Sequence, residues 1–157
     1  MRMDPRCRRI NELSGRSQQL NRQLTERYLD EVCGEMALPE TLCIGDYVFL
    51  ACVGECGGGA AAMSRIARKL GINPSTATRQ VNRLLADGLV TKSAARDDDR
   101  RYEIRLTEAG RRLNARMEDM LYAAIQTAYE SVSEADLNVV YRFMEAFNGS
   151  LEQLLEK

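Results

Sequence analysis

Apolar residues recur every three to four positions along most of the chain, the spacing that predicts amphipathic helices. The first stripe, from Ile10 to Val32, predicts a long helix that ends near Gly34. A second helix is predicted over residues 41–53. The glycine-rich stretch GECGGGAAA, residues 54–62, has no periodicity and no Gly-Lys-Ser/Thr ending, so we interpret it as a loop rather than a phosphate-binding loop.

Two more helices are predicted in the last third of the chain. A long apolar stripe runs from Leu113 to Ala128. Ser133 and Asp136 then have the spacing of a capping box, which predicts the start of a last helix that extends to Leu155. Both helices are long and amphipathic.

Two short helices joined by a tight turn are predicted in the middle of the chain. The segment MSRIARKLG, residues 63–71, has a helical apolar stripe, and Gly71 stands where a helix ends in the left-handed conformation. Asn73 is a good N-cap and Pro74 a good first helical residue for the next helix. The predicted buried face of that helix consists of Ala77, Val81, Leu84 and Leu85.

The opposite face of this second short helix is polar, with hydroxyls and arginines near its amino end. It contains Ser75, Thr76, Thr78, Arg79, Asn82 and Arg83. This arrangement is typical of a helix-turn-helix whose second helix enters the major groove of DNA. The alternative is an ordinary helical hairpin with a solvated face.

The segments LVTKSA (89–94) and RYEIRLT (101–107) alternate apolar and polar residues and predict a β-hairpin. Its inward-facing residues are Leu89, Ile104 and Leu106. At its tip, Asp97, Asp98 or Asp99 can pair with Arg100 or with the backbone and hold another arginine outward, toward the narrow minor groove of DNA. The hairpin would then be the wing of a winged helix.

Charge and composition support this interpretation. Residues 63–112 contain 12 Lys and Arg against 6 Asp and Glu, a net charge of +6, although the whole chain has a net charge of -1. A basic block in an acidic chain favours a phosphate-binding surface, with a solvated helix face as the alternative.

The chain has no histidine, so no nucleophile–base pair can be named. We therefore assign no catalytic residue and consider an enzyme disfavoured. Because no stretch has the pattern of a secretory signal or a membrane span, we expect a cytoplasmic protein without membrane contact.

Residues 63–110 resemble the winged helix of the MarR family, the multiple-antibiotic-resistance regulators. The similar features are the helix-turn-helix, Thr78-Arg79, Gly-Leu-Val, Asp-Arg-Arg and the Leu-Thr-x-x-Gly that ends at Gly110. The resemblance implies a mainly α fold with a small β-hairpin wing. It also implies that residues 1–157 form a single protomer. Its winged helix-turn-helix region would be 36–112, and its dimerisation helices 8–35 and 113–157.

The resemblance also implies a homodimer that binds a pseudo-palindromic double-stranded operator and is released by an effector. The wing motif Asp-x-Arg corresponds to Asp99 and Arg101, with Arg101 the candidate for the minor groove. The residues expected to contact DNA are Arg65, Ser75, Thr76, Thr78, Arg79, Asn82, Arg83, Arg96, Asp99, Arg100 and Arg101.

The cysteines leave several interpretations open. Cys43, Cys52 and Cys56 could bind a soft metal or metalloid, two of them could oxidise reversibly, or Cys43 and Cys52 could be core residues with Cys56 a bystander. Cys7 lies beside arginines that would lower its pKa, or on a flexible arm. The metal is unknown, and no cofactor is expected to be required.

We therefore expect a sequence-specific DNA-binding repressor that a small ligand, a soft metal or an oxidant releases. The alternative is a winged-helix module for protein interaction that has no effector response and would leave the basic block unused.

Overall fold

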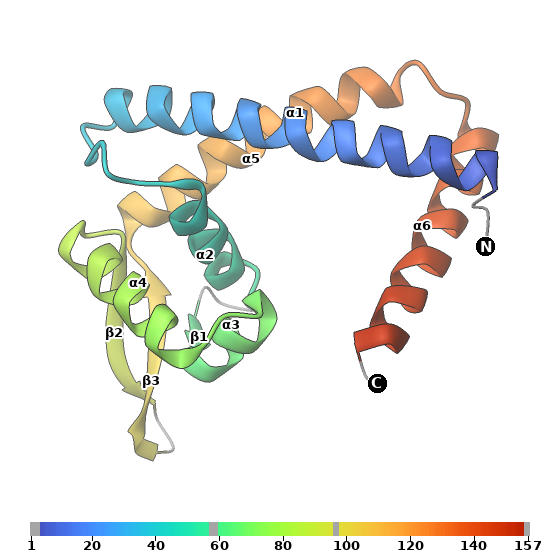
Figure 1. Cartoon of the computed structure of the whole chain (residues 1–157). Helices are drawn as coiled ribbons and strands as arrows, with labels where there is room; N and C mark the ends of the chain where they lie inside the picture. Colours follow the sequence, from blue (N-terminus) through green and yellow to red (C-terminus); the bar gives the residue numbers. More distant parts are fainter. Residues whose placement is uncertain (1–3, 57–59, 96–97, 156–157) are drawn as a thin grey trace. The chain divides into compact units, whose positions relative to one another are not determined.

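The computed structural model describes residues 4–56, 60–95 and 98–155, and the chain forms two compact units, residues 1–119 and 120–157. The first unit contains α1 (Pro5–Glu35), α2 (Ile44–Gly54), β1 (Ala60–Ala62), α3 (Met63–Leu70), α4 (Pro74–Ala86), β2 (Val90–Ala95) and β3 (Asp98–Leu106) (Figure 1). α5 (Glu108–Tyr129) begins in the first unit and continues into the second, which also contains α6 (Glu134–Leu155). The expected fold class, mainly α with a small β-hairpin, is confirmed.

Most helix boundaries agree with the sequence pattern, but α2 begins at Ile44, three residues after the expected start at Thr41. Cys43 is the N-cap, and its backbone N–H donates to Asp46 Oδ2 at 3.1 Å. Cysteine is not among the preferred N-cap residues, so the pattern did not indicate this boundary.

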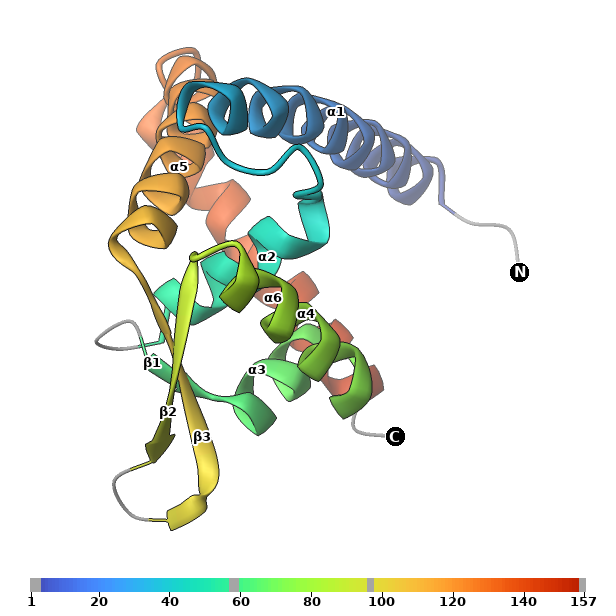
Figure 2. The ribbon, with the colours of Figure 1, turned by 90° about the vertical axis from the view of Figure 1, so that its left-hand side faces the viewer.

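Three antiparallel strands form a sheet in the order β1-β3-β2. β2 and β3 form the predicted hairpin, which extends beyond α3 and α4 in both ribbon views (Figures 1 and 2). The prediction of a loop over residues 54–62 is wrong at its end, because Ala60–Ala62 form β1 and pair with β3 from Ala60 opposite Arg105 to Ala62 opposite Glu103. Alanine is depleted in strands, so local sequence does not indicate β1; pairing with β3, distant in sequence, and burial of Ala61 stabilise it.

One apolar core joins the end of α1, α2, α3, α4, the sheet and the start of α5. Leu89, Ile104 and Leu106 are buried as expected, whereas Leu85 is half-buried. The largest fully buried side chains are Phe49, Leu29, Leu50, Ile66, Leu84, Leu89, Ile104, Leu113 and Met117. This core holds α3 and α4 against the hairpin.

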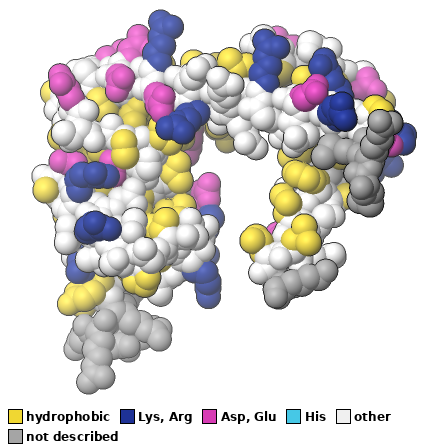
Figure 3. Space-filling view, in the orientation of Figure 1, with side chains coloured by type: hydrophobic (Ala, Val, Ile, Leu, Met, Phe, Trp, Pro, Cys, Tyr) yellow, Lys and Arg dark blue, Asp and Glu magenta, His cyan; other side chains and the backbone are white. Residues whose placement is uncertain are grey.

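The second unit exposes its apolar residues. Ser133 caps α6 as predicted, because its Oγ accepts from the backbone N–H of Asp136 at 3.2 Å. No residue of α6 is buried, and the rings of Phe143 and Phe147 stack with centroids 6.0 Å apart. Figure 3 shows hydrophobic side chains along this helix. Within the described ranges, none of the helices has both the length and the apolar character needed to cross a membrane.

Candidate nucleic-acid interface

The turn between α3 and α4 has the geometry that its sequence predicts. Gly71 ends α3 with φ 63°, and the N–H of Ile72 donates to the carbonyl of Ala67 at 3.0 Å. Asn73 Oδ1 accepts from the backbone N–H of Thr76 at 2.8 Å and from Ser75 Oγ at 2.7 Å. These bonds fix the direction in which α4 leaves the turn.

α4 presents a polar face to solvent. Ser75, Thr78, Arg79 and Asn82 are exposed, and Thr76 is half-buried. Thr78 Oγ1 donates to the carbonyl of Pro74 at 2.9 Å, so this hydroxyl remains able to accept a further bond. The guanidinium of Arg79 forms no hydrogen bond or ion pair with any residue that the structure describes. Of these exposed polar side chains, Ser75, Thr78 and Arg79 lie in the first two turns of α4, and Asn82 lies in the third.

Arg83 has a protein partner that sequence analysis did not identify. Its Nη2 pairs with the carboxylate of Asp46 on α2, a fully buried residue, while the Arg83 side chain stays 46% exposed. The neighbouring carboxylate raises the pKa of Arg83, so the guanidinium stays charged. Arg83 is thus anchored to α2, in contrast to Arg79.

The basic block contains cations of two kinds. Lys69, Arg105 and Arg111 pair with Glu55, Glu103 and Glu108 respectively, and Arg83 pairs with Asp46. Arg65 and Arg68 on α3 are exposed and, like Arg79, have no ion pair among the described residues. The cations without an acidic partner therefore include three on the helix-turn-helix, and Arg68 is one that the sequence analysis did not select.

The tip of the hairpin is irregular. β2 and β3 pair in register from Val90 opposite Leu106 to Ala94 opposite Tyr102, and then Ala95 stands opposite Asp98. Residues 99–101 therefore form a bulge on β3. The structure describes the backbone of Asp99, Arg100 and Arg101 but not their side chains, and Arg96 lies outside the described residues, so their contacts with DNA stay predictions.

Below the bulge, the ammonium of Lys92 lies 3.9 Å from the centre of the Tyr102 ring. This cation–π contact joins the two strands on one face of the hairpin. The residues occur 10 positions apart, and only the strand register brings them together. The sequence pattern predicts no role for either residue.

The cysteines are not brought together. Cys43 is exposed at the amino end of α2, whereas Cys52 and Cys56 are buried near its carboxyl end, and nine residues of helix separate Cys43 from Cys52 by about 13 Å. Cys56 Sγ donates to the carbonyl of Cys52 at 3.3 Å, and burial raises the pKa of the Cys52 thiol. Among the described residues, no group of three His, Cys, Asp or Glu could hold a metal ion. Cys52 and Cys56 are core residues here, and Cys7 is exposed.

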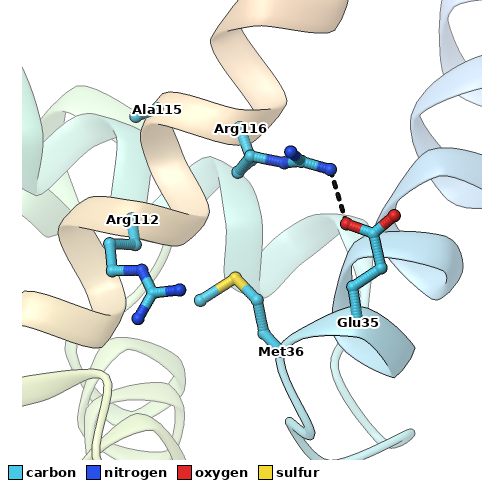
Figure 4. A pocket seen from close by; sticks show the side chains of 5 residues that line it. All are labelled: Glu35, Met36, Arg112, Ala115 and Arg116. Carbon is cyan, nitrogen blue, oxygen red and sulfur yellow. Dashed lines mark hydrogen bonds and ion pairs between the residues drawn. The ribbon is translucent and has the colours of Figure 1, made fainter.

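A cavity of about 270 Å³ lies between the end of α1 and the first turns of α5 (Figure 4). It is lined by Glu35, Met36, Arg112, Ala115 and Arg116. Arg116 pairs with Glu35, while Arg112 has no ion pair among the described residues. The cavity thus combines one unpaired cation with the apolar side chain of Met36.

Comparison with known proteins supports the resemblance found in the sequence. Residues 45–102 match the model of the MarR family. The HTH-type transcriptional repressor IacR from Pseudomonas putida is 29% identical over 96 residues, which are 61% of this chain and 58% of that protein, so the match spans less than two thirds of IacR.

Solved structures show the same fold. FabT from Streptococcus pneumoniae, in complex with DNA, has a TM-score of 0.79 at 19% identity and covers 94% of this chain and 98% of its own. A mutant MarR from E. coli, complexed with operator DNA, has a TM-score of 0.64 at 14% identity and covers 88% of this chain and 92% of its own. The winged-helix fold is therefore confirmed.

Proposed function

We propose that this chain, with its MarR family match over residues 45–102, is a transcriptional regulator that binds a pseudo-palindromic DNA operator as a homodimer. The observation that supports it best is the helix-turn-helix whose second helix, α4, exposes Thr78 and Arg79, with no acidic partner for Arg79 among the residues that the structure describes. IacR is a transcriptional repressor, and the FabT and MarR structures contain DNA, so we propose repression rather than an enzymatic activity.

In the proposed complex, the exposed face of α4 lies in the major groove. Arg79 there can donate two bonds to one guanine, and Thr78 can contact a base edge or a thymine methyl group. The β2–β3 hairpin would follow the adjacent minor groove with Arg101 at its bulge. Arg65 and Arg68 on α3 would add to the attraction for phosphates.

Three classes of effector were expected, and they differ in structural support. A soft metal has no group of three thiols to bind, since Cys43 is separated from Cys52 and Cys56. An oxidant would reach Cys7 and Cys43, which are exposed, before the buried thiols. A small ligand has a cavity available at Met36 and Arg112. We therefore propose a small ligand or an oxidant, and not a soft metal, as the effector.

The alternative, a module used only for protein interaction, gives the unpaired cations of α3 and α4 no role.

The proposed function is tested by selecting duplexes from a random-sequence pool with the purified protein. Fluorescence anisotropy then measures the affinity for the selected duplex and for a scrambled one at the same salt concentration. We expect the selected duplex to bind at least about 10³-fold more tightly. Equal affinity for both duplexes, or no binding, would contradict the proposed function.

A further inference from the structure

The carboxylate of Asp46 is fully buried at the start of α2 and is surrounded by donors. Its Oδ2 accepts from the backbone N–H of Cys43 at 3.1 Å and from the Cys43 thiol at 3.2 Å. Its Oδ1 accepts from Gln80 Nε2 at 3.4 Å and pairs with Arg83 Nη2. A buried carboxylate is costly without such partners, so these contacts depend on one another.

Both side-chain partners from outside α2 stand on α4, one turn apart. Gln80 and Arg83 are spaced i and i+3, so they lie on the same face of the helix. Gln80 Nε2 also donates to the carbonyl of Gly45 at 2.6 Å. Arg83 Nη2 also lies 3.9 Å from Cys43 Sγ, so the amino end of α2 contacts two successive turns of α4 through four polar contacts.

These bonds restrict α4 in a way that its apolar contacts do not. The buried face of α4 contains Ala77, Val81 and Leu84. Dispersion contacts between such side chains are weakly directional, whereas hydrogen bonds and a salt bridge require defined distances and angles. The polar bonds thus fix the rotation of α4 about its own axis, which decides where Thr78 and Arg79 point.

We infer that Asp46, Gln80 and Arg83, together named the Asp46 clamp, position α4 for DNA, and that Arg83 acts through Asp46 rather than through a phosphate. This inference rests on the proposed function and assigns Arg83 a different role from the DNA contact expected from the sequence. Arg83 is a positioning residue, and Arg79, four residues earlier on the same helix, is the contact residue.

The salt dependence of binding separates the two roles. Removing a phosphate contact makes the slope of log affinity against log salt less steep by about 0.9, and it weakens all duplexes alike. For Arg83→Met we expect the affinity for the selected duplex to fall at least about tenfold, with the slope and the affinity for the scrambled duplex unchanged. Arg79→Met is the matched control. We expect it to make the salt slope less steep or to reduce the ratio of the affinities for the selected and scrambled duplexes.

Two further variants keep the test independent of that one substitution. Gln80→Met removes donors without removing charge, and we expect it to weaken the selected duplex about three- to tenfold with no change in slope. Arg83→Lys keeps a cation that can approach Asp46 and should restore part of the affinity lost in Arg83→Met. The inference would be overturned if Arg83→Met made the salt slope less steep and lowered the affinity for both duplexes equally.

The clamp is also measurable without DNA. In urea unfolding, Asp46→Asn and Arg83→Met should each lower the free energy of unfolding. The double variant should lose clearly less than the sum of the two single losses, because both substitutions remove the same interaction. If the losses of unfolding free energy are additive, Asp46 and Arg83 do not interact and the clamp is refuted, even if the protein binds DNA. A wild-type protein that binds no duplex, with non-additive losses in urea, would refute the positioning role together with the proposed function.

Discussion

Single residues define the junction between the hairpin and α5. Thr107 Oγ1 donates to the carbonyl of Gly88 at 2.7 Å and accepts from the N–H of Gly110 at 3.1 Å, so it joins the start of β2 to the start of α5. A Cβ at Gly110 would lie 2.2 Å from the carbonyl oxygen of Leu89. The Leu-Thr-x-x-Gly pattern therefore has a structural reason, since only glycine allows α5 to approach the backbone so closely.

Gly110→Ala should destabilise the protein by about 2–3 kcal/mol, because backbone must move to admit the methyl group. The measurement is the urea midpoint at one fixed protein concentration. Gly34→Ala is the control, since a Cβ placed there would meet no described atom within 4 Å beyond its chain neighbours and its own helix, and a helical alanine should be neutral or stabilising by up to about 1 kcal/mol. A Gly110→Ala midpoint equal to that of Gly34→Ala would show that the junction is not tightly packed.

The thiols should fall into two classes of reactivity. Cys7 and Cys43 are exposed, whereas Cys33, Cys52 and Cys56 are buried. Titration of the native protein with Ellman's reagent should give a fast phase of two thiols, with the other three reacting only on unfolding. Cys43→Ser should remove one equivalent from the fast phase. Fast reaction of Cys52 or Cys56 in the native protein would show that these thiols are not buried.

Stability should decrease at alkaline pH. Burial raises the pKa of Cys33 and Cys52 above the ordinary value of 9.0. The unfolded chain then loses these protons at lower pH than the folded chain, so the stabilisation is fully present below pH 9.0 and is lost as pH rises through the raised values. Urea midpoints measured across this range should fall, and the fall should be smaller in a Cys33→Ala, Cys52→Ala double variant. An equal fall in both proteins would assign the effect to other groups.

At the scale of elements, the sequence predicts best where the signals are local. Gly71 and Asn73 mark the turn between α3 and α4, and the structure confirms both, because capping depends on residues within one turn. Long-range features were not predictable. β1 exists because β3 offers it an edge, and the Asp46–Arg83 pair joins residues 37 positions apart. Helical periodicity reveals which face is polar, but not which polar side chain has a protein partner.

The wing and α4 should contribute differently to DNA binding. Arg101 follows two other residues of the bulge on β3, at the outer end of a hairpin held by the Lys92–Tyr102 contact. Arg101→Ala should weaken binding to selected and scrambled duplexes alike and make the salt slope less steep by about 0.9. Tyr102→Leu, which removes the ring beneath Lys92, should weaken binding without that change in slope. Unchanged affinity and slope in Arg101→Ala would contradict the assignment of the wing.

At the scale of the whole molecule, apolar residues are buried in one part of the chain and exposed in others. The core of the first unit contains nearly all buried side chains, while α1 exposes Ile10, Leu13, Leu20 and Leu24. α6 exposes a second set, Val139, Val140, Tyr141, Phe143, Met144, Phe147, Leu151, Leu154 and Leu155. Soluble monomers rarely expose so many large apolar side chains on whole helices, so a second copy of the chain is the expected cover for these faces.

A homodimer is therefore the expected state in solution. Sedimentation equilibrium at micromolar concentration should give twice the chain mass of 17.7 kDa. Phe147→Glu places a charge on the exposed apolar face of α6, beside its stacking partner Phe143, and should raise the dimer dissociation constant at least about tenfold.

Gln153→Glu is the matched control for this test, because it adds the same charge to a polar, exposed position of the same helix. The control should leave the dimer intact. Because two half-sites need two copies of α4, Phe147→Glu should also lose affinity for a two-half-site duplex while keeping that for a single half-site. A wild-type mass of 17.7 kDa, or a Phe147→Glu protein as dimeric as Gln153→Glu, would mean that α6 is not the interface and that another partner covers its apolar face.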